Sequence, residues 1–242
     1  MKNIFIFLLT ILCISSADSI HPYPVGNPSL SEEPIVILDR HIVEINENHI
    51  EISYPMALGI ENKDRVNEII RNYIYEMVER DRAGIYEMYG LLLILDYKIE
   101  FLNDKFISIK YEGSFGAIGN AGRGYIRLIY TLNIDMQEGK IINKEDIIKN
   151  EKEIFELLMQ DRFEIIGGTV DMPPFSSTQA IRKNEGMKAS NLDYYINEGK
   201  FIIVQGAYSA HAKCSIDLDE VKEYLDEDIV EKICGTQKEE QG

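Results

Sequence analysis

Three segments in the middle of the chain alternate apolar and polar residues with a period of two. The alternation runs over residues 97–101, 107–112 and 126–135. Successive side chains of a strand point to opposite faces, so this period predicts antiparallel strands with one face on a core and the other towards water. The predicted strands follow one another as meanders and do not alternate with helices. The sequence therefore indicates the α+β class.

Apolar residues at steps of three and four predict a long amphipathic helix over residues 62–82, after strand-like patterns at 34–45 and 49–54. This stripe comprises Val66, Ile69, Ile70, Tyr73, Ile74, Met77 and Val78. Asn143, with Asp146 three residues on as a capping-box partner, predicts the start of a second helix between two groups of strands. The later strands are expected at 194–196, 201–204 and 213–216, followed by a short helix over 218–225.

The N-terminus has the order of a secretory signal peptide. Lys2 precedes an uncharged apolar run over residues 4–14 and small residues at 15–17. This run is shorter than the roughly 20 residues that span a bilayer comfortably. We expect cleavage after residue 17, a secreted or extracytoplasmic location (periplasm or cell surface) and no membrane span afterwards. An uncleaved anchor and a buried N-terminal helix are the alternatives.

Composition divides the remainder of the chain. Residues 18–34 carry four of the seven prolines, which predicts an extended tail. We expect an N-terminal α+β lobe over 35–142, a C-terminal α+β lobe over 143–235 packed on it, and a disordered tail over 236–242. Cys214 and Cys234 are the cysteines left after signal cleavage, and in an exported protein they form either a disulfide or two separate thiols. The sequence does not decide between these, nor does it give the oligomeric state.

The chain is strongly acidic. It has 25 Lys and Arg against 41 Asp and Glu, a formal charge of −16, which becomes −17 when a signal peptide containing Lys2 is removed. Nucleic-acid binding rests on Lys and Arg at phosphates, so this charge argues against it. It favours a basic partner through electrostatic steering. The alternative is that the charge only keeps a secreted protein in solution.

A glycine-rich stretch over residues 113–124 fits none of three catalytic or phosphate-binding loops. A dinucleotide loop needs a following helix, an NTPase loop needs Lys and Ser or Thr after its last glycine, and a nucleophile elbow needs G-x-S-x-G before a helix. Here Tyr125 and Ile126 follow Gly124, and a strand is predicted next. We therefore predict a wide connection between antiparallel strands, in which Asn120, Arg123 and Tyr125 are the candidates for contact with a partner; the alternative is a loop without a partner.

No other set of residues has the spacing of a catalytic or metal site. His211 lies near Tyr208 and Cys214, but residues three apart on a strand point to opposite faces, which argues against a Cys–His pair. The chain has no H-x-H, H-E-x-x-H or C-x-x-C spacing for a metal. We predict no catalytic residue, no metal and no cofactor, and add Tyr208 and His211 to the candidate contact residues.

Residues 107–148 and 194–225 carry a family resemblance. They resemble an extracytoplasmic bacterial domain of largely unassigned function, found in the lysozyme-sensing anti-sigma factor RsiV and ahead of the catalytic domain in PdaC-type peptidoglycan deacetylases. The matching features are a tyrosine-rich strand, an N-x-D and x-G-K pair, an Asp-led helix and a late hairpin, here Tyr130, Asn133, Asp135, Gly139, Lys140, Asp146, Tyr208 and Ile216. The family often has Gly-Ala-His in the preceding loop, whereas residues 119–122 read Gly-Asn-Ala-Gly. A histidine-dependent role of that loop is therefore not implied.

The resemblance covers most of residues 40–225 and implies an extracytoplasmic module without a deacetylase domain. We expect a non-catalytic binding or sensor module, whose partner is a basic protein, such as a lysozyme-like one, or a cell-wall glycan. The alternatives are a hydrolase of wall polymers that uses surface carboxylates, and a structural surface protein.

Overall fold

The structure of this protein is a computed structural model that describes residues 35–45, 48–85, 91–117, 126–168, 192–207 and 210–235. Two β-sheets and a small number of helices make up the described fold. The first sheet contains, in spatial order, β1 (Ile35–Ile45), β2 (Asn48–Leu58), β3 (Leu91–Leu102), β4 (Phe106–Ala117), β5 (Ile126–Asp135) and β6 (Lys140–Ile141). The second contains β7 (Glu164–Gly168), β10 (Ala210–Asp217), β9 (Lys200–Ala207) and β8 (Leu192–Asn197). The helices are α1 (Lys63–Ile85), α2 (Lys144–Ile147), α3 (Glu151–Met159), α5 (Leu218–Val221) and α6 (Glu227–Cys234), with a 3₁₀ turn η2 (Lys222–Tyr224).

The first sheet is mixed, which corrects the expectation of purely antiparallel meanders. Strands β2 and β3 are parallel, with Ile50 opposite Leu93 and Ile52 opposite Leu95. The reason is the connection between them. Parallel neighbours need a crossover of a dozen or more residues, and the segment containing α1 returns the chain to the end at which β2 began. The other pairs in both sheets are antiparallel.

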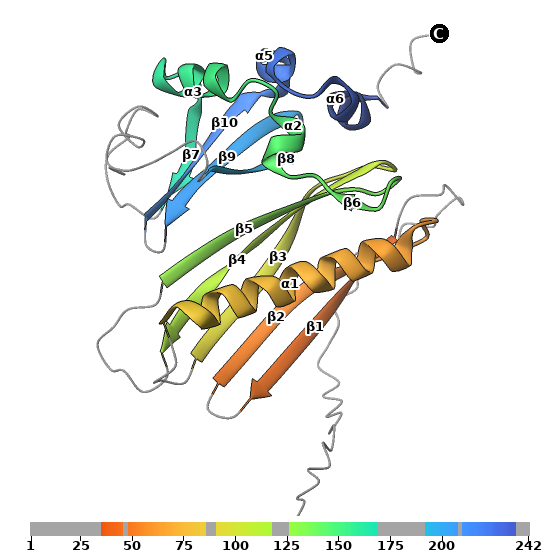
Figure 1. Cartoon of the computed structure of the whole chain (residues 1–242), viewed down its shortest axis with the longest axis vertical. Helices are drawn as coiled ribbons and strands as arrows, with labels where there is room; N and C mark the ends of the chain where they lie inside the picture. The colour runs from red at the N-terminus through yellow and green to blue at the C-terminus, as the bar shows by residue number, and fades with distance from the viewer. Residues whose placement is uncertain are drawn as a thin grey trace, which may run out of the picture. The chain divides into compact units, whose positions relative to one another are not determined.

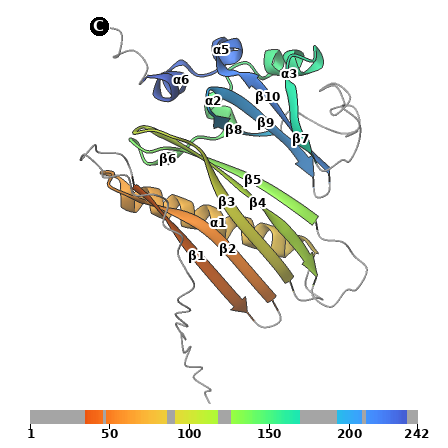
Figure 2. The same ribbon diagram turned by 180° about the vertical axis from the view of Figure 1, so that it is seen from behind.

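Helix α1 covers one face of the first sheet, in front of the strands in Figure 1 and behind them in Figure 2. Its buried residues fall at steps of three and four: Val66, Ile70, Ile74 and Met77. They pack against apolar residues of β2 to β5 in one continuous core. The amide group of Asn67 fixes the start of the helix to β2, because it accepts from Ala57 N at 2.6 Å and donates to Ala57 O at 3.0 Å.

A row of tyrosines crosses this core. Tyr97, Tyr111 and Tyr130 stand directly opposite one another on β3, β4 and β5. Tyr73 of α1 lies above the row, with its ring centroid 6.2 Å from that of Tyr111. The Tyr111 hydroxyl is fully buried and has no hydrogen-bond partner among the described residues. Burial raises the pKa of Tyr111 well above its usual value, so the phenol stays protonated.

The second sheet has its own core on the face that carries the short helices. In Figure 1, α3 and α5 lie on the side of this sheet remote from the first, whereas α6 reaches the turns of the first sheet. The single helix expected after Asn143 is two helices. Ile148 ends α2 by bridging to Leu225, and the Asn150 side chain caps α3 by accepting from Glu153 N at 3.4 Å. The predicted capping-box contact is present at the first of them, where Asp146 accepts from Asn143 N at 2.7 Å.

The predicted signal peptide, the proline-rich tail and the C-terminal tail over 236–242 lie outside the described residues. Within the described part of the chain, no helix has the length and apolar character needed to cross a membrane.

Two buried tyrosines allow a matched test of the core. Tyr111→Phe removes a hydroxyl that has no partner, so we expect the free energy of unfolding to rise by up to about 1 kcal/mol. Tyr194→Phe removes a hydroxyl that donates to Ile142 O at 3.0 Å, so we expect a loss of about 1–2 kcal/mol. The chain has no tryptophan, so unfolding in urea is followed by far-UV circular dichroism. A clear loss of stability in Tyr111→Phe would contradict the assignment of an unpaired hydroxyl.

Candidate functional site

Strand β4 turns one face to α1 and the other to the second sheet. Its odd-numbered residues from Ile107 to Tyr111 belong to the core under α1. The sequence predicts that the alternate, polar residues face water, and here the structure differs. Ser108 is fully buried and Lys110 is 8% exposed. The second sheet packs against this polar face, with Tyr195, Ile202 and Val204 buried beside Ile129 of β5.

Two side chains of the first sheet hold the edge of the second. Ser108 Oγ donates to Asn133 Oδ1 at 2.6 Å and accepts from Ile196 N at 3.1 Å. Asn133 Nδ2 donates to Tyr194 O at 2.9 Å. These bonds satisfy backbone groups of β8 that would otherwise be free, because β8 is the last strand of its sheet. The side chains thus take the place of a further strand.

Beside Ser108 and Asn133, which we call the clamp, lie four paired charges and a tyrosine ring. We call this group the inter-sheet cluster: Glu100, Lys110, Glu112, Tyr195 and Lys213. Lys110 Nζ lies 2.8 Å from Glu100 Oε1, 3.0 Å from Glu112 Oε2 and 5.7 Å from the centroid of the Tyr195 ring. Lys213 Nζ of β10 lies 3.4 Å from Glu112 Oε1. The cluster therefore joins β3 and β4 of the first sheet to β8 and β10 of the second.

The charged groups of the cluster stabilise one another's ionised forms. Burial opposes ionisation of Glu100, but hydrogen bonds from Lys110 and Lys98 outweigh it and lower the pKa of that carboxyl. The pKa of Glu112 is lowered in the same way, against burial, by Lys110 and Lys213. Burial also opposes the charge of Lys110, yet bonds to the two carboxylates raise its pKa. Burial raises the pKa of Tyr195 to about 12.

These shifts decide what the cluster can do chemically. A general acid or base that works near neutral pH needs a pKa near that pH. In the cluster, the carboxyl pKa values move further below neutrality, and those of Lys110 and Tyr195 further above it. In the described ranges no His, Cys, Asp and Glu side chains gather in a group that could hold a metal ion. The arrangement suits a fixed polar contact between two sheets.

The candidate contact residues predicted from the sequence fall mostly outside the structure's described ranges. Asn120, Arg123, Tyr125 and Tyr208 lie outside them. His211 lies on β10, opposite Gly206 of β9. Of the two cysteines, Cys214 is a buried free thiol and Cys234 an exposed free thiol.

The inter-sheet cluster lies on the strands that lead to those predicted residues. Glu112 lies five residues before the end of β4 at Ala117, which precedes the segment containing Asn120. Lys213 lies three residues after the start of β10 at Ala210, which follows Tyr208. The ion pair between them joins the two strands close to both connections. Sequence reasoning missed the inter-sheet cluster, although charged residues at alternate positions of the predicted strands 97–101 and 107–112 were its signal.

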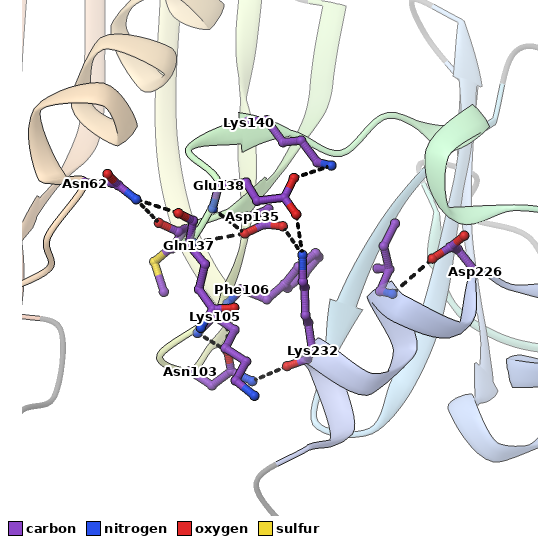
Figure 3. A network of polar contacts seen from close by, with 12 residues as sticks. Asn62, Asn103, Lys105, Phe106, Asp135, Gln137, Glu138, Lys140, Asp226 and Lys232 are labelled. Atoms are coloured by element: carbon purple, nitrogen blue, oxygen red, sulfur yellow. Dashed lines mark hydrogen bonds and ion pairs between the residues drawn. The ribbon is translucent and has the colours of Figure 1, made fainter.

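A second polar network attaches helix α6 to the first sheet (Figure 3). Lys232 Nζ donates to the buried Asp135 at 2.5 Å and to Glu138 at 3.0 Å. Asp135 also accepts from Gln137 N and Glu138 N, both at 2.9 Å, which shapes the turn after β5. Asn103 Nδ2 donates to Lys232 O at 2.9 Å. The C-terminal end of α6 is thereby held to the β3–β4 and β5–β6 turns.

Some of the residues that carried the family resemblance occupy these junctions, and others lie in the cores. Asn133 belongs to the clamp on β8, and Asp135 binds Lys232. Gly139 has a φ of +59°, a conformation that favours glycine, and its carbonyl accepts from Arg65 Nε at 2.5 Å. Tyr130 and Ile216 are buried, one in each large core. Each of these residues therefore has a structural role.

The fold has counterparts among solved structures. A DUF3298 family protein from Pseudomonas aeruginosa PAO1 matches with a TM-score of 0.50 and 11% identity, over 82% of this chain and 96% of that one. A DUF3298 family member from Bacteroides fragilis NCTC 9343 matches with a TM-score of 0.49 and 10% identity, over 85% of this chain and all of the other. No family model matches the sequence, and no curated protein matches it. At these identities, the similarity to the Pseudomonas protein is one of fold.

Removal of the central cation tests the inter-sheet cluster. Lys110→Met leaves Glu100, whose side chain is 2% exposed, beside Glu112 without their shared partner, so we expect unfolding to become easier by about 3 kcal/mol. The matched control is Lys152→Met, which breaks an exposed pair with Glu156 and is expected to cost less than about 0.5 kcal/mol. Equal small effects in urea denaturation would mean that the cluster contributes little.

The pKa shifts also predict how stability depends on pH. Because the folded-state pKa values of Glu100 and Glu112 are lowered, their contribution is present above their usual value of 4.5 and is lost as the pH falls through the folded values. The raised pKa of Lys110 means that its contribution is present below 10.5 and is lost as the pH rises through the folded value. The loss of unfolding free energy in Lys110→Met, compared with that in Lys152→Met, should therefore be smallest at the acidic and alkaline ends of the pH range. A constant difference from pH 3 to pH 11 would contradict this prediction.

Proposed function

We propose that this chain is an extracytoplasmic, non-catalytic binding module whose partner is a basic protein. The observation that carries the proposal is the charge of the surface formed by α5, η2 and α6. Seven carboxylates are exposed there: Asp217, Asp219, Glu220, Glu223, Glu227, Asp228 and Glu231. The lysines of the same segment are already engaged, Lys222 with Asp219 and Lys232 with Asp135. Ion pairs within the described residues reach only Asp219 and Glu220 among the seven.

This surface is suited to recognition of a cationic protein. Complementary charge raises the rate of encounter and suppresses like-charged partners, and it acts over about 10 Å at moderate salt. The whole chain carries a formal charge of −16, so the field of the remaining surface supports the same partner. The signal-like N-terminus supports an extracytoplasmic location. The resemblance to the RsiV and PdaC-type domains supports a lysozyme-like protein as the first partner to test.

The described residues offer less to the hydrolase alternative. A glycosidase of the common type needs a carboxyl with a raised pKa as general acid and a second carboxylate about 5–10 Å away. Where a pKa shift is resolved for a described Asp or Glu, it is downwards, at Glu100, Glu112, Glu138 and Asp226. No described observation favours catalysis over binding.

Binding of lysozyme to the immobilised protein tests the proposal. We expect saturable binding at about 20 mM salt that weakens by about tenfold or more at about 300 mM. Glu227→Lys, Asp228→Lys and Glu231→Lys together should abolish it, because they reverse three charges of the α6 surface. An acidic protein of similar size and purified peptidoglycan are tested in parallel. Binding to peptidoglycan alone would point to a glycan partner.

The matched control reverses three exposed charges elsewhere: Glu61→Lys, Glu68→Lys and Glu76→Lys, in and just before α1. Each triple variant changes the formal charge from −16 to −10, since three negative residues become positive. A greater loss of affinity in the α6 variant places the partner on that surface. Equal losses would mean that only the net charge matters, and absence of binding at low salt would exclude a lysozyme-like partner.

A further inference from the structure

Strand β1 forms an end of the first sheet and has a long, regular edge. Its eleven residues pair with β2 along their whole length, from Ile35 opposite Leu58 to Ile45 opposite Asn48, without a shift of register. Among the described strands β2 is its only neighbour, and Figures 1 and 2 both show β1 at the end of the sheet. The outer backbone groups of a terminal strand are a template for pairing with another strand.

Each of the other three sheet ends has a structural feature that limits its pairing with another strand. At β8, the side chains of Ser108 and Asn133 bond the backbone of the strand. At the β5 end, β6 pairs with only the last two residues, while Thr131 O accepts from Tyr73 OH at 2.8 Å and Asn133 O accepts from Ile142 N at 2.8 Å. Strand β7 is five residues long, ends in Gly167 and Gly168, and has an irregular register against β10.

Among the contacts of the described residues, none of these features is found at β1. It is neither short nor glycine-containing, its register is regular, and seven of its eleven residues are Ile, Val or Leu. Proteins blunt free edges because such strands pair with other chains. The contrast with the other three ends makes this edge the candidate for pairing with another chain.

We propose that β1 pairs with β1 of a second copy of this chain, antiparallel about a two-fold axis at Arg40. The axis stands perpendicular to the sheet, so the two copies form one continuous sheet with both α1 helices on the same face. An interface of this kind is closed, because the same surface of each copy is used.

Apart from Val36, which stands opposite the partner's Glu44, the sequence of β1 is compatible with its own reverse in this register. Residues of an antiparallel pair that are equally far from the axis stand opposite one another. Leu38 then meets Ile42 of the partner subunit, Ile37 meets the partner's Val43, and Ile35 meets the partner's Ile45. Asp39 meets the partner's His41, an acid opposite a potential cation. Arg40 opposite the partner's Arg40 is the one pair of like charges.

A second copy fits the edge better than the chain's own N-terminal segment. Residues 18–34 contain Pro22, Pro24, Pro28 and Pro34, and proline cannot donate to a ladder of strand hydrogen bonds.

Charge gives the pairing a distinctive salt dependence. Each copy carries a formal charge of −16, so the copies repel one another and added salt strengthens the dimer. Binding of a basic partner has the opposite dependence, which separates this proposal from the proposed function.

Sedimentation velocity over a range of concentrations tests the pairing. We expect a monomer–dimer equilibrium that shifts towards dimer at higher salt. Ile42→Lys places a lysine opposite the partner's Leu38 and should weaken the dimer by about tenfold or more. Position 42 stands opposite Glu51, outside the core positions Ile50 and Ile52. Arg40→Thr removes the like-charged pair and should strengthen the dimer, a gain that a residue with only a role in folding would not produce.

Cysteine cross-linking tests the register, with Cys13 and Cys234 changed to serine. Arg40→Cys should oxidise to a disulfide-linked dimer, because opposite Cα atoms in an antiparallel pair are about 4.5–5.5 Å apart. Val43→Cys is the control, since its two copies would lie roughly 20 Å apart, six residues along the strand. A parent protein that stays monomeric at high salt with its β1 amides protected from hydrogen exchange would overturn the proposal, because another segment would then cover the edge. An unprotected monomer, or equal cross-linking through both positions, would overturn it too.

Discussion

The structure depends on how the terminal strand β8 is held against the face of another sheet. A terminal strand leaves backbone N–H and C=O groups without partners, and burial of such groups costs about 1–3 kcal/mol each. Ser108 and Asn133 supply the missing partners from β4 and β5. Because both side chains are themselves buried and bonded to each other, they fix β8 at one height on the first sheet. The position of β9, β10 and the helices that pack on them follows from this contact.

The same constraint explains the charges between the sheets. A face that meets backbone groups must be polar, and polar side chains that become buried must find partners. Glu100 meets this requirement with Lys110, Lys98 and Asn197, and Glu112 does so with Lys110 and Lys213. Such pairs add little net stability compared with an apolar contact, but removal of one partner is costly. We infer that they make the relative position of the two sheets specific, and with it the relation between the strands on either side of residues 118–125 and 208–209.

Sequence patterns predicted the elements better than their assembly. The alternation at 107–112 and 126–135 corresponds to β4 and β5, and 201–204 and 213–216 lie in β9 and β10, because strand periodicity is a local property. The parallel pairing of β2 with β3 depends on where the chain returns after α1, which no local pattern contains. Likewise, Lys110 and Glu112 have the pattern of residues that face water, and only the docking of the second sheet covers that face. The signature of the inter-sheet cluster, acids and lysines at alternate positions of adjacent strands, is also the signature of an ordinary solvated face. Of the predicted contact residues, only the backbone of His211 falls within the described ranges.

The placement of the motif residues bears on where function is to be sought. Asn133, Asp135 and Gly139 are explained by the clamp, the α6 attachment and a turn with positive φ. Residues explained in this way identify an architecture, and a sequence that resembles others at such positions shares a scaffold with them before it shares a ligand. Function is therefore to be sought on the surface of this scaffold, at the charge on α5 and α6, the connections between strands and the edge of β1. The two contacts that we propose respond to salt in opposite directions, since a basic partner would be released by added salt and a second acidic copy would be favoured by it. Ionic strength would therefore set which of the two contacts a given population of molecules makes.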